Sequence, residues 1–283
     1  MLGSAASPHL DEESDPVTTY EVDAAWSRTV FGRRTGQAAA FFLPYLRPGM
    51  RLIDCGCGPG SITADLAEAV APGEVVGFDL RPDALAQGRL LARERGLPNL
   101  TFELADIYRL PHADNSFDAA WSCAVIQHLA DPVQGLKEIR RVLRPGGVIG
   151  IADGSSPVTF RYPTNPSLEL WDGLREREAN SSVGRKPTAL VLRALLREAG
   201  FTQTAVSAQM AQEDGPTAGT LEDTRRVAQN HLLRVRGLLG RRAVERGWLS
   251  DHDLEQIADA LVAWGDDPDA VYTRPVFTAI GWN

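Results

Sequence analysis

Sulfur and imidazole ligands are scarce in this chain of 283 residues, which has three cysteines and five histidines. Cys55 and Cys57 lie inside a glycine-rich turn, and no Cys or His near them in the sequence completes a tetrahedral set. We therefore expect neither a disulfide framework nor a metal site. Small apolar packing groups are the expected role of these cysteines.

Long apolar runs and an excess of basic charge are also missing. No stretch is long enough to span a bilayer, and the N-terminus lacks the charged and then apolar regions of a signal peptide. The chain has 29 Lys and Arg against 37 Asp and Glu, a net charge of −8, and a pI of about 5.2. An acidic surface disfavours nucleic acid and anionic membranes as partners. These absences favour a cytoplasmic enzyme.

Glycine, by contrast, is plentiful, and three of the 26 glycines lie close together in one informative stretch. The residues from Leu52 to Thr63 are typical of the end of a buried strand, a tight turn and the start of a helix. Gly56, Gly58 and Gly60 permit positive φ angles and let a ligand lie against bare backbone. The alternative is that these glycines only allow the helix to pack against the strand.

The turn departs from the pattern that binds dinucleotides. Ser61 stands where G-x-G-x-x-G requires its third glycine, and Pro59 removes a backbone N–H that a pyrophosphate would use. Asp54 precedes the turn, and its carboxylate would repel a pyrophosphate but suit a cationic ligand. The sequence therefore disfavours an NAD-dependent oxidoreductase.

Strand and helix patterns alternate regularly between positions 51 and 153. This alternation predicts βαβ crossovers and an α/β fold with a doubly wound, mostly parallel sheet. The expected strands are Arg51–Asp54, Glu74–Asp79, Leu100–Leu104, Ala119–Ser122 and Val148–Ala152. The expected helices are Ile62–Val70, Pro82–Arg95 and Pro132–Leu143.

Acidic residues stand at the ends of the first three expected strands, where ligands of open parallel sheets bind. Asp54 ends the first strand. Asp79 ends the second and could accept hydrogen bonds from two ribose hydroxyls, or could cap the helix that begins near Pro82. Asp106 follows the third, placed to accept from an adenine amino group with the Ile107 N–H at a ring nitrogen. On its own, Asp106 would read as a turn residue.

Several of these features together resemble the class I S-adenosylmethionine (SAM) methyltransferases, in particular the branch with the ubiquinone and menaquinone methyltransferases. The resemblance covers about residues 41–153 and rests on linked motifs: Asp54-Cys55-Gly56-Cys57-Gly58-Pro59-Gly60, Val76-Gly77-Phe78-Asp79, Ala105-Asp106, Phe117-Asp118-Ala119 and Leu143-Arg144-Pro145-Gly146-Gly147. It implies a seven-stranded sheet with an antiparallel last strand, SAM as cofactor, and transfer of its methyl group to a small molecule. It also implies that Leu80 and Ser122 contribute to the cofactor site.

Two residues after the fourth and fifth expected strands are candidates for the chemical step. His128 could act as a general base or could be structural. Asp153 could hold or deprotonate a substrate, or could cap the following turn. The N/D-P-P-Y-like motif of DNA and many protein amide methyltransferases is missing after the fourth strand, which disfavours a nucleic-acid substrate.

The rest of the chain predicts additions to a single domain at 16–283, after a disordered tail at 1–15. A helical segment is expected from Tyr20 to Tyr45. Additions at 153–187 and 213–269 are expected to form a lid or substrate region, with helices at Leu168–Glu178, Leu221–Leu239 and Asp251–Trp264. Between and after them we expect a helix at Thr188–Ala199 and strands at Thr204–Gln209 and Val276–Trp282. The oligomeric state is left open between monomer and homodimer. The rival hypothesis is a SAM-binding scaffold that does not transfer the methyl group.

Overall fold

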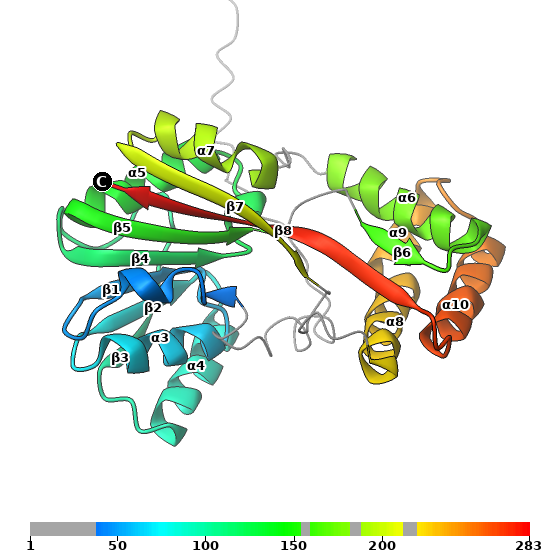
Figure 1. The fold of residues 1–283 in the computed structure, drawn as a ribbon, viewed down its shortest axis with the longest axis horizontal. Helices are drawn as coiled ribbons and strands as arrows, with labels where there is room; N and C mark the ends of the chain where they lie inside the picture. The colour runs from blue at the N-terminus through cyan, green and yellow to red at the C-terminus, as the bar shows by residue number, and fades with distance from the viewer. Residues whose placement is uncertain (1–37, 154–158, 182–187, 212–219) are drawn as a thin grey trace, which may run out of the picture.

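The computed structural model describes residues 38–153, 159–181, 188–211 and 220–283 (Figure 1). The expected tail at 1–15 and most of the helix expected from Tyr20 to Tyr45 lie outside these residues. The described end of that segment forms turns and a short 3₁₀ helix, η1 (Leu43–Tyr45). None of the helices in the described ranges combines the length and apolar character needed to cross a membrane.

A mostly parallel sheet forms the centre of the molecule. Its first five strands lie in the order β3-β2-β1-β4-β5, and all pair in parallel. The antiparallel strand β8 pairs with β5 through its residues 277–282, and β7 pairs with β8 along 274–282. The predicted antiparallel last strand is thus confirmed. The sheet has eight strands rather than the predicted seven, because the short strand β6 also pairs with β8. The strand bounds are β1 (Leu52–Cys55), β2 (Val75–Asp79), β3 (Leu100–Leu104), β4 (Phe117–Cys123), β5 (Leu143–Asp153), β6 (Phe160–Tyr162), β7 (Gln203–Ala211) and β8 (Val271–Trp282).

Two apolar cores cover the two faces of this sheet, as the predicted doubly wound fold requires. Leu52, Val75 and Ala119 pack with the first pair of helices, whereas Ile53, Val76 and Ala120 pack with the second pair. Because side chains alternate along a strand, consecutive residues of the buried strands supply opposite cores. The first pair is α3 (Ser61–Val70) and α4 (Pro82–Glu94), and the second is α5 (Pro132–Val142) and α7 (Thr188–Glu198).

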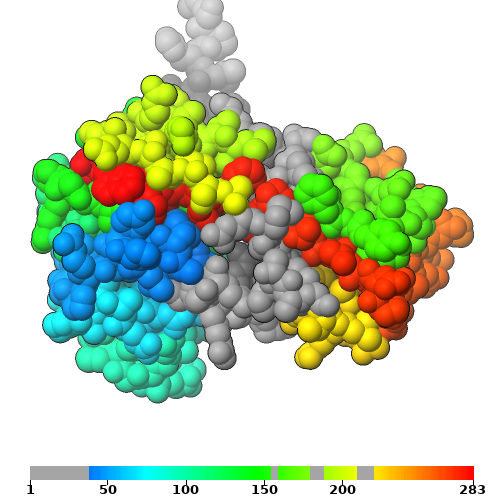
Figure 2. All heavy atoms as spheres, in the orientation of Figure 1, coloured from blue at the N-terminus to red at the C-terminus, as the bar shows by residue number. Residues whose placement is uncertain are grey.

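The parts expected as separate additions come together in one helical unit, which we define as β6, residues 271–273 of β8, and four helices. These helices are α6 (Pro166–Ser181), α8 (Leu221–Arg236), α9 (Leu238–Glu245) and α10 (Asp251–Gly265). They share a third apolar core around Trp171, Val227 and Trp264. Figures 1 and 2 show this unit at the opposite end of the long axis from α3 and α4, joined to the sheet by β8.

Three boundaries in this region differ from the prediction. The helix expected over Leu221–Leu239 is two helices, because Gly237 adopts an extended conformation with φ −93° and ψ −151°. Strand β6 was not predicted, since three residues give too short a pattern. Strand β8 begins at Val271 rather than Val276, because residues 271–273 pair with β6. The sequence did not predict this part of the strand because Pro275 cannot donate a ladder hydrogen bond, yet β8 continues through it.

Candidate functional site

The carboxyl ends of three adjacent strands lie level with one another. Cys55 of β1 is in register with Phe78 of β2 on one side and with Ser122 of β4 on the other. The glycine turn leaves β1 at this level and leads into α3. Segments that follow β1, β2 and β4 therefore meet at one edge of the sheet, which we call the carboxyl edge.

The glycine turn requires its glycines for conformation and for space. Gly56, Gly58 and Gly60 have φ angles of 72°, 55° and 80°, a region that side chains rarely adopt. A Cβ added at Gly56 would lie 2.4 Å from Val125 Cγ2, and one at Gly60 would lie 2.5 Å from Phe102 Cζ. Two of the glycines thus have a packing role, which is compatible with a ligand approaching the same backbone.

Asp54 is a buried carboxyl group at the start of this turn. It is 3% exposed, and one of its oxygens accepts a hydrogen bond of 2.6 Å from the hydroxyl of Thr63, in the first turn of α3. Burial raises the pKa of Asp54 to about 7; the Thr63 hydrogen bond opposes this rise and the nearby charge of Asp79 adds to it. A cationic group bound beside Asp54 would stabilise the ionised form.

Asp79 ties the second strand to the glycine turn. Its Oδ2 accepts a hydrogen bond of 2.9 Å from the Gly58 N–H, and its Oδ1 accepts one of 3.0 Å from the Arg81 N–H. The N-cap of α4 is Arg81, so Asp79 lies before the cap position. A carboxylate has about four acceptor positions, so Asp79 retains capacity for a diol. Leu80 beside it is a half-exposed apolar side chain.

Asp106 lies in a turn after β3. Its Oδ1 accepts a hydrogen bond of 2.9 Å from the Tyr108 N–H, and its backbone carbonyl accepts one of 3.0 Å from the Arg109 N–H. Asp106 therefore stabilises a turn, which is the alternative role that the sequence offered for it. Ile107 is buried in the core that α5 and α7 cover. No hydrogen bond from the described residues reaches the second carboxylate oxygen of Asp106.

Ser122 is fully buried near the end of β4. Its hydroxyl has no hydrogen-bond partner among the described residues. The register places Ser122 between Cys55 and Ile151, both of which belong to the core on the α5 and α7 face. A buried hydroxyl without a partner costs about 1–3 kcal/mol, so this position is either strained or completed by a group that binds there.

His128 and Asp153 lie close together but in different environments. His128 is partly buried at the end of η2 (Ile126–His128). Asp153 is fully buried, and its Oδ2 accepts hydrogen bonds of 2.9 Å from the Gln127 N–H and 3.3 Å from the Thr188 hydroxyl. Asp153 therefore joins the end of β5 to η2 and to the start of α7.

Three residues of this edge were missed from the sequence: Thr63, Gln127 and Thr188. Thr63 could have been found, because the first turn of a helix that follows a glycine turn faces back to the preceding strand. Gln127 and Thr188 contact Asp153 from positions 26 and 35 residues away. No local pattern signals contacts of that range.

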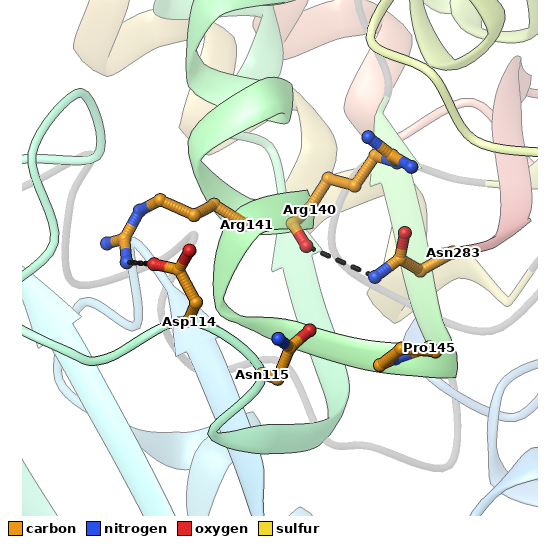
Figure 3. Close-up of a pocket in the computed structure, with 6 residues that line it drawn as sticks. All are labelled: Asp114, Asn115, Arg140, Arg141, Pro145 and Asn283. Atoms are coloured by element: carbon orange, nitrogen blue, oxygen red, sulfur yellow. Dashed lines mark hydrogen bonds and ion pairs between the residues drawn. The ribbon is translucent and has the colours of Figure 1, made fainter.

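A pocket of about 380 Å³ lies away from these residues, and Figure 3 shows its lining. Asp114 and Asn115 precede β4, Arg141 is near the end of α5, and Asn283 follows β8. This is the edge where strands β4 and β5 begin, opposite the carboxyl edge. Arg141 is already paired with Asp114 at 2.6 Å, and the Asn283 amide donates to the Arg140 carbonyl at 3.3 Å. We therefore assign the functional site to the carboxyl edge.

Known proteins are similar to this chain in sequence and in fold. The family described as a methyltransferase domain matches residues 46–184. A demethylmenaquinone methyltransferase of Beutenbergia cavernae is 35% identical over 174 residues, which cover 55% of this chain and 67% of that protein. An uncharacterized protein from a transposon of Streptomyces fradiae is 48% identical over 120 residues, which cover 41% of this chain and 34% of the relative. The chain thus spans only about a third of the length of that relative.

Among solved structures, the YcgJ protein of Bacillus subtilis superposes with a TM-score of 0.54. It is 18% identical, and the match covers 88% of this chain and 98% of that one. A likeness at this level of identity shows the fold, which agrees with the sheet order described above.

Proposed function

The chain belongs to the class I SAM-dependent methyltransferases, and we propose that it transfers the methyl group of SAM to a small-molecule acceptor at the carboxyl edge. The observation that carries this proposal is the set of acidic residues at the carboxyl ends of β1 and β2 and after β3, around a turn whose glycines exclude side chains. This set suits a ligand with a cationic amino-acid end and a ribose, and it suits a pyrophosphate poorly.

We assign the cofactor-binding roles by the chemistry of each group. Asp54 offers a carboxylate to a cationic group, and Gly56, Gly58 and Gly60 allow close approach of the backbone. Asp79 accepts from the ribose hydroxyls while it holds the Gly58 N–H. The remaining members of the proposed site are Leu80, Asp106, Ile107 and Ser122.

Bound SAM supplies an electrophilic methyl group with a good leaving group, so the protein contributes mainly by positioning. A base is needed only where the acceptor begins protonated. We assign the contact with the acceptor to His128, which is partly buried. Asp153 is fully buried and hydrogen-bonded, and we assign it the role of holding η2 in place.

The acceptor and the organisation of the chain complete the proposal. We propose a small-molecule acceptor methylated at O, N or C, and no nucleic-acid or membrane partner. We propose that residues 16–283 form one domain. We also propose that the protein is cytoplasmic and is a monomer or a homodimer. The additions at 153–187 and 213–269 are proposed to cover the acceptor.

Release of S-adenosylhomocysteine (SAH) tests this function. The protein is incubated with SAM and a panel of phenols, quinols and amines, and SAH is measured together with the mass of the acceptor. We expect SAH release that depends on one class of acceptor and matches the methylated product. SAM binding without acceptor-dependent SAH release across the panel would favour the scaffold.

A further inference from the structure

The segment after β4 is held in place at several points. Ala124 has a positive φ of 57°, unusual for a residue with a side chain, and its N–H donates to the Ala152 carbonyl at 2.8 Å. The side chain of Val125 lies over Gly56. The N–H of Gln127 donates to Asp153, which also accepts from Thr188. The backbone that carries His128 is therefore fixed by the end of β5 and the start of α7.

The side chain of Gln127 contacts the ring of His128. Its Nε2 lies 3.1 Å from His128 Nε2 and 3.5 Å from the Ala124 carbonyl oxygen. A carbonyl oxygen only accepts hydrogen bonds, so the amide presents its NH₂ group on this side. The same NH₂ group then donates to His128 Nε2, which must be an acceptor. In a neutral imidazole, the proton is consequently on Nδ1.

We propose that Gln127 is a positioning residue that holds His128 as the neutral Nδ1–H tautomer. Asp153 and Thr188 support it by fixing the Gln127 backbone. The role of the ring toward the acceptor rests on the proposed function. The tautomer itself does not, because it follows from contacts within the protein.

A consequence follows for the chemistry of the site. With its Nε2 lone pair occupied by the amide, His128 cannot take a proton at Nε2 while Gln127 keeps this orientation. For His128 to act as a base through Nε2, the side-chain amide of Gln127 must rotate. Its carbonyl oxygen can then accept a hydrogen bond from the newly formed Nε2–H. Gln127 would thus decide whether the ring orients the acceptor or takes its proton.

The tautomer can be measured on the full chain by ¹⁵N nuclear magnetic resonance with labelled histidine, and His128→Gln identifies the signals of this ring. In the wild type we expect the ring proton on Nδ1. In Gln127→Glu the carboxylate can only accept, so the proton should move to Nε2. Gln127→Met keeps the length but removes the polar group, so the preference for one tautomer should be lost. Gln203→Glu, at an exposed residue of β7, is the matched control and should leave the His128 signals unchanged.

Two results would overturn the proposal: a wild-type ring with its proton on Nε2, or signals in Gln127→Glu equal to those of the wild type. SAH affinity, measured in parallel, should change less than about twofold in both Gln127 variants, since neither removes a proposed cofactor contact. Failure of the wild type to bind SAH would count against the proposed function and leave the tautomer result standing. A thermal melt of each variant separates loss of folding from loss of positioning.

Discussion

Asp54 combines burial with a charge that its proposed ligand needs. Its carboxyl group is buried beside Thr63, and the pKa of about 7 means that near neutral pH the protein holds a mixture of protonated and ionised forms. A cation bound beside it favours the ionised form. Cofactor binding and the proton on Asp54 are therefore linked.

This linkage predicts a pH-dependent affinity for SAH. Raising the pH from 6 to 8 takes a group of pKa about 7 from roughly one tenth to nine tenths ionised, so affinity should rise about tenfold. Titration calorimetry at several pH values measures this. Asp54→Asn should bind more weakly and lose most of the slope, and an unchanged slope in that variant would contradict the role of Asp54.

Folding stability should respond in the opposite direction. Because burial raises the pKa of Asp54 in the folded state, its contribution is most favourable below the unfolded value of 3.8 and is lost as pH rises through about 7. Without ligand, Asp54→Asn should therefore lose less stability than the wild type between pH 5 and 8, as measured by denaturant unfolding. An equal loss in both proteins would show that Asp54 does not titrate in this range.

At the scale of elements, the turn between β1 and α3 is shaped by the ring of Phe102. This ring fills the space that a Cβ would need at Gly60 and also at Gly88 of α4, where the distance to Cε1 would be 2.7 Å. Phe102 is buried. The ring of Phe102 on β3 thus limits how closely α3 and α4 approach the sheet. It thereby also fixes the position of the glycine turn.

Gly60→Ala should therefore cost more stability than a positive φ alone explains. Gly96 is the matched control, with φ of +64° against +80° for Gly60, and a Cβ there meets nothing within 4 Å. We expect about 1–2 kcal/mol for Gly96→Ala from the positive φ and about 1–3 kcal/mol more for Gly60→Ala from overpacking. Denaturant unfolding of the two variants tests this, and Phe102→Leu combined with Gly60→Ala should recover part of the difference. Equal losses at Gly60 and Gly96 would rule out the packing constraint.

The elements that the sequence predicted well are those with local signals. Pro82 begins α4, and the hydrophobic runs of β1 and β2 are buried on both faces, so pattern and structure agree within a residue or two. Strand β6 and the first residues of β8 pair across 110 residues of chain, Tyr272 with Arg161, and no short window contains that information. For the same reason, the sequence identified Asp54, Asp79 and Asp106 at strand ends but could not reveal that the Gln127 N–H donates to Asp153, 26 residues away.

At the scale of the whole molecule, a buried polar cluster holds the helical unit together. The Arg161 side chain is 2% exposed, pairs with Asp172 at 3.1 Å, and lies over the rings of Trp264 and Tyr272 at 4.7 Å and 4.9 Å. His231 Nδ1 accepts from Trp171 Nε1 at 2.9 Å. Residues of β6, α6, α8, α10 and β8 meet here, so both sequence additions depend on one cluster.

The helical unit lies beyond the carboxyl edge. Asp153, the last residue of β5, pairs with Phe277, and the earlier residues of β8 continue past it into the helical unit (Figure 1). This placement supports the proposal that the unit covers the acceptor.

Hydrogen exchange measured by mass spectrometry tests the cover. Lids order when ligands bind, so adding SAH should slow exchange in α6 and α8 as well as at the glycine turn. NAD at the same concentration is the control and should protect neither region. Protection confined to residues 54–106 would contradict a lid.

The central claim is that the carboxyl edge binds SAM and its product, and titration calorimetry with SAH tests it most directly. The wild type should bind SAH at one site and show no tight binding of NAD. Asp79→Ala removes the proposed pair of hydrogen bonds to the ribose and should weaken binding by about 1.5–3 kcal/mol, or roughly 10- to 150-fold. Asp83→Asn, at an exposed carboxylate four positions away on α4, is the control and should bind like the wild type. Wild-type affinity for SAH in Asp79→Ala, or tight binding of NAD by the parent protein, would contradict the account.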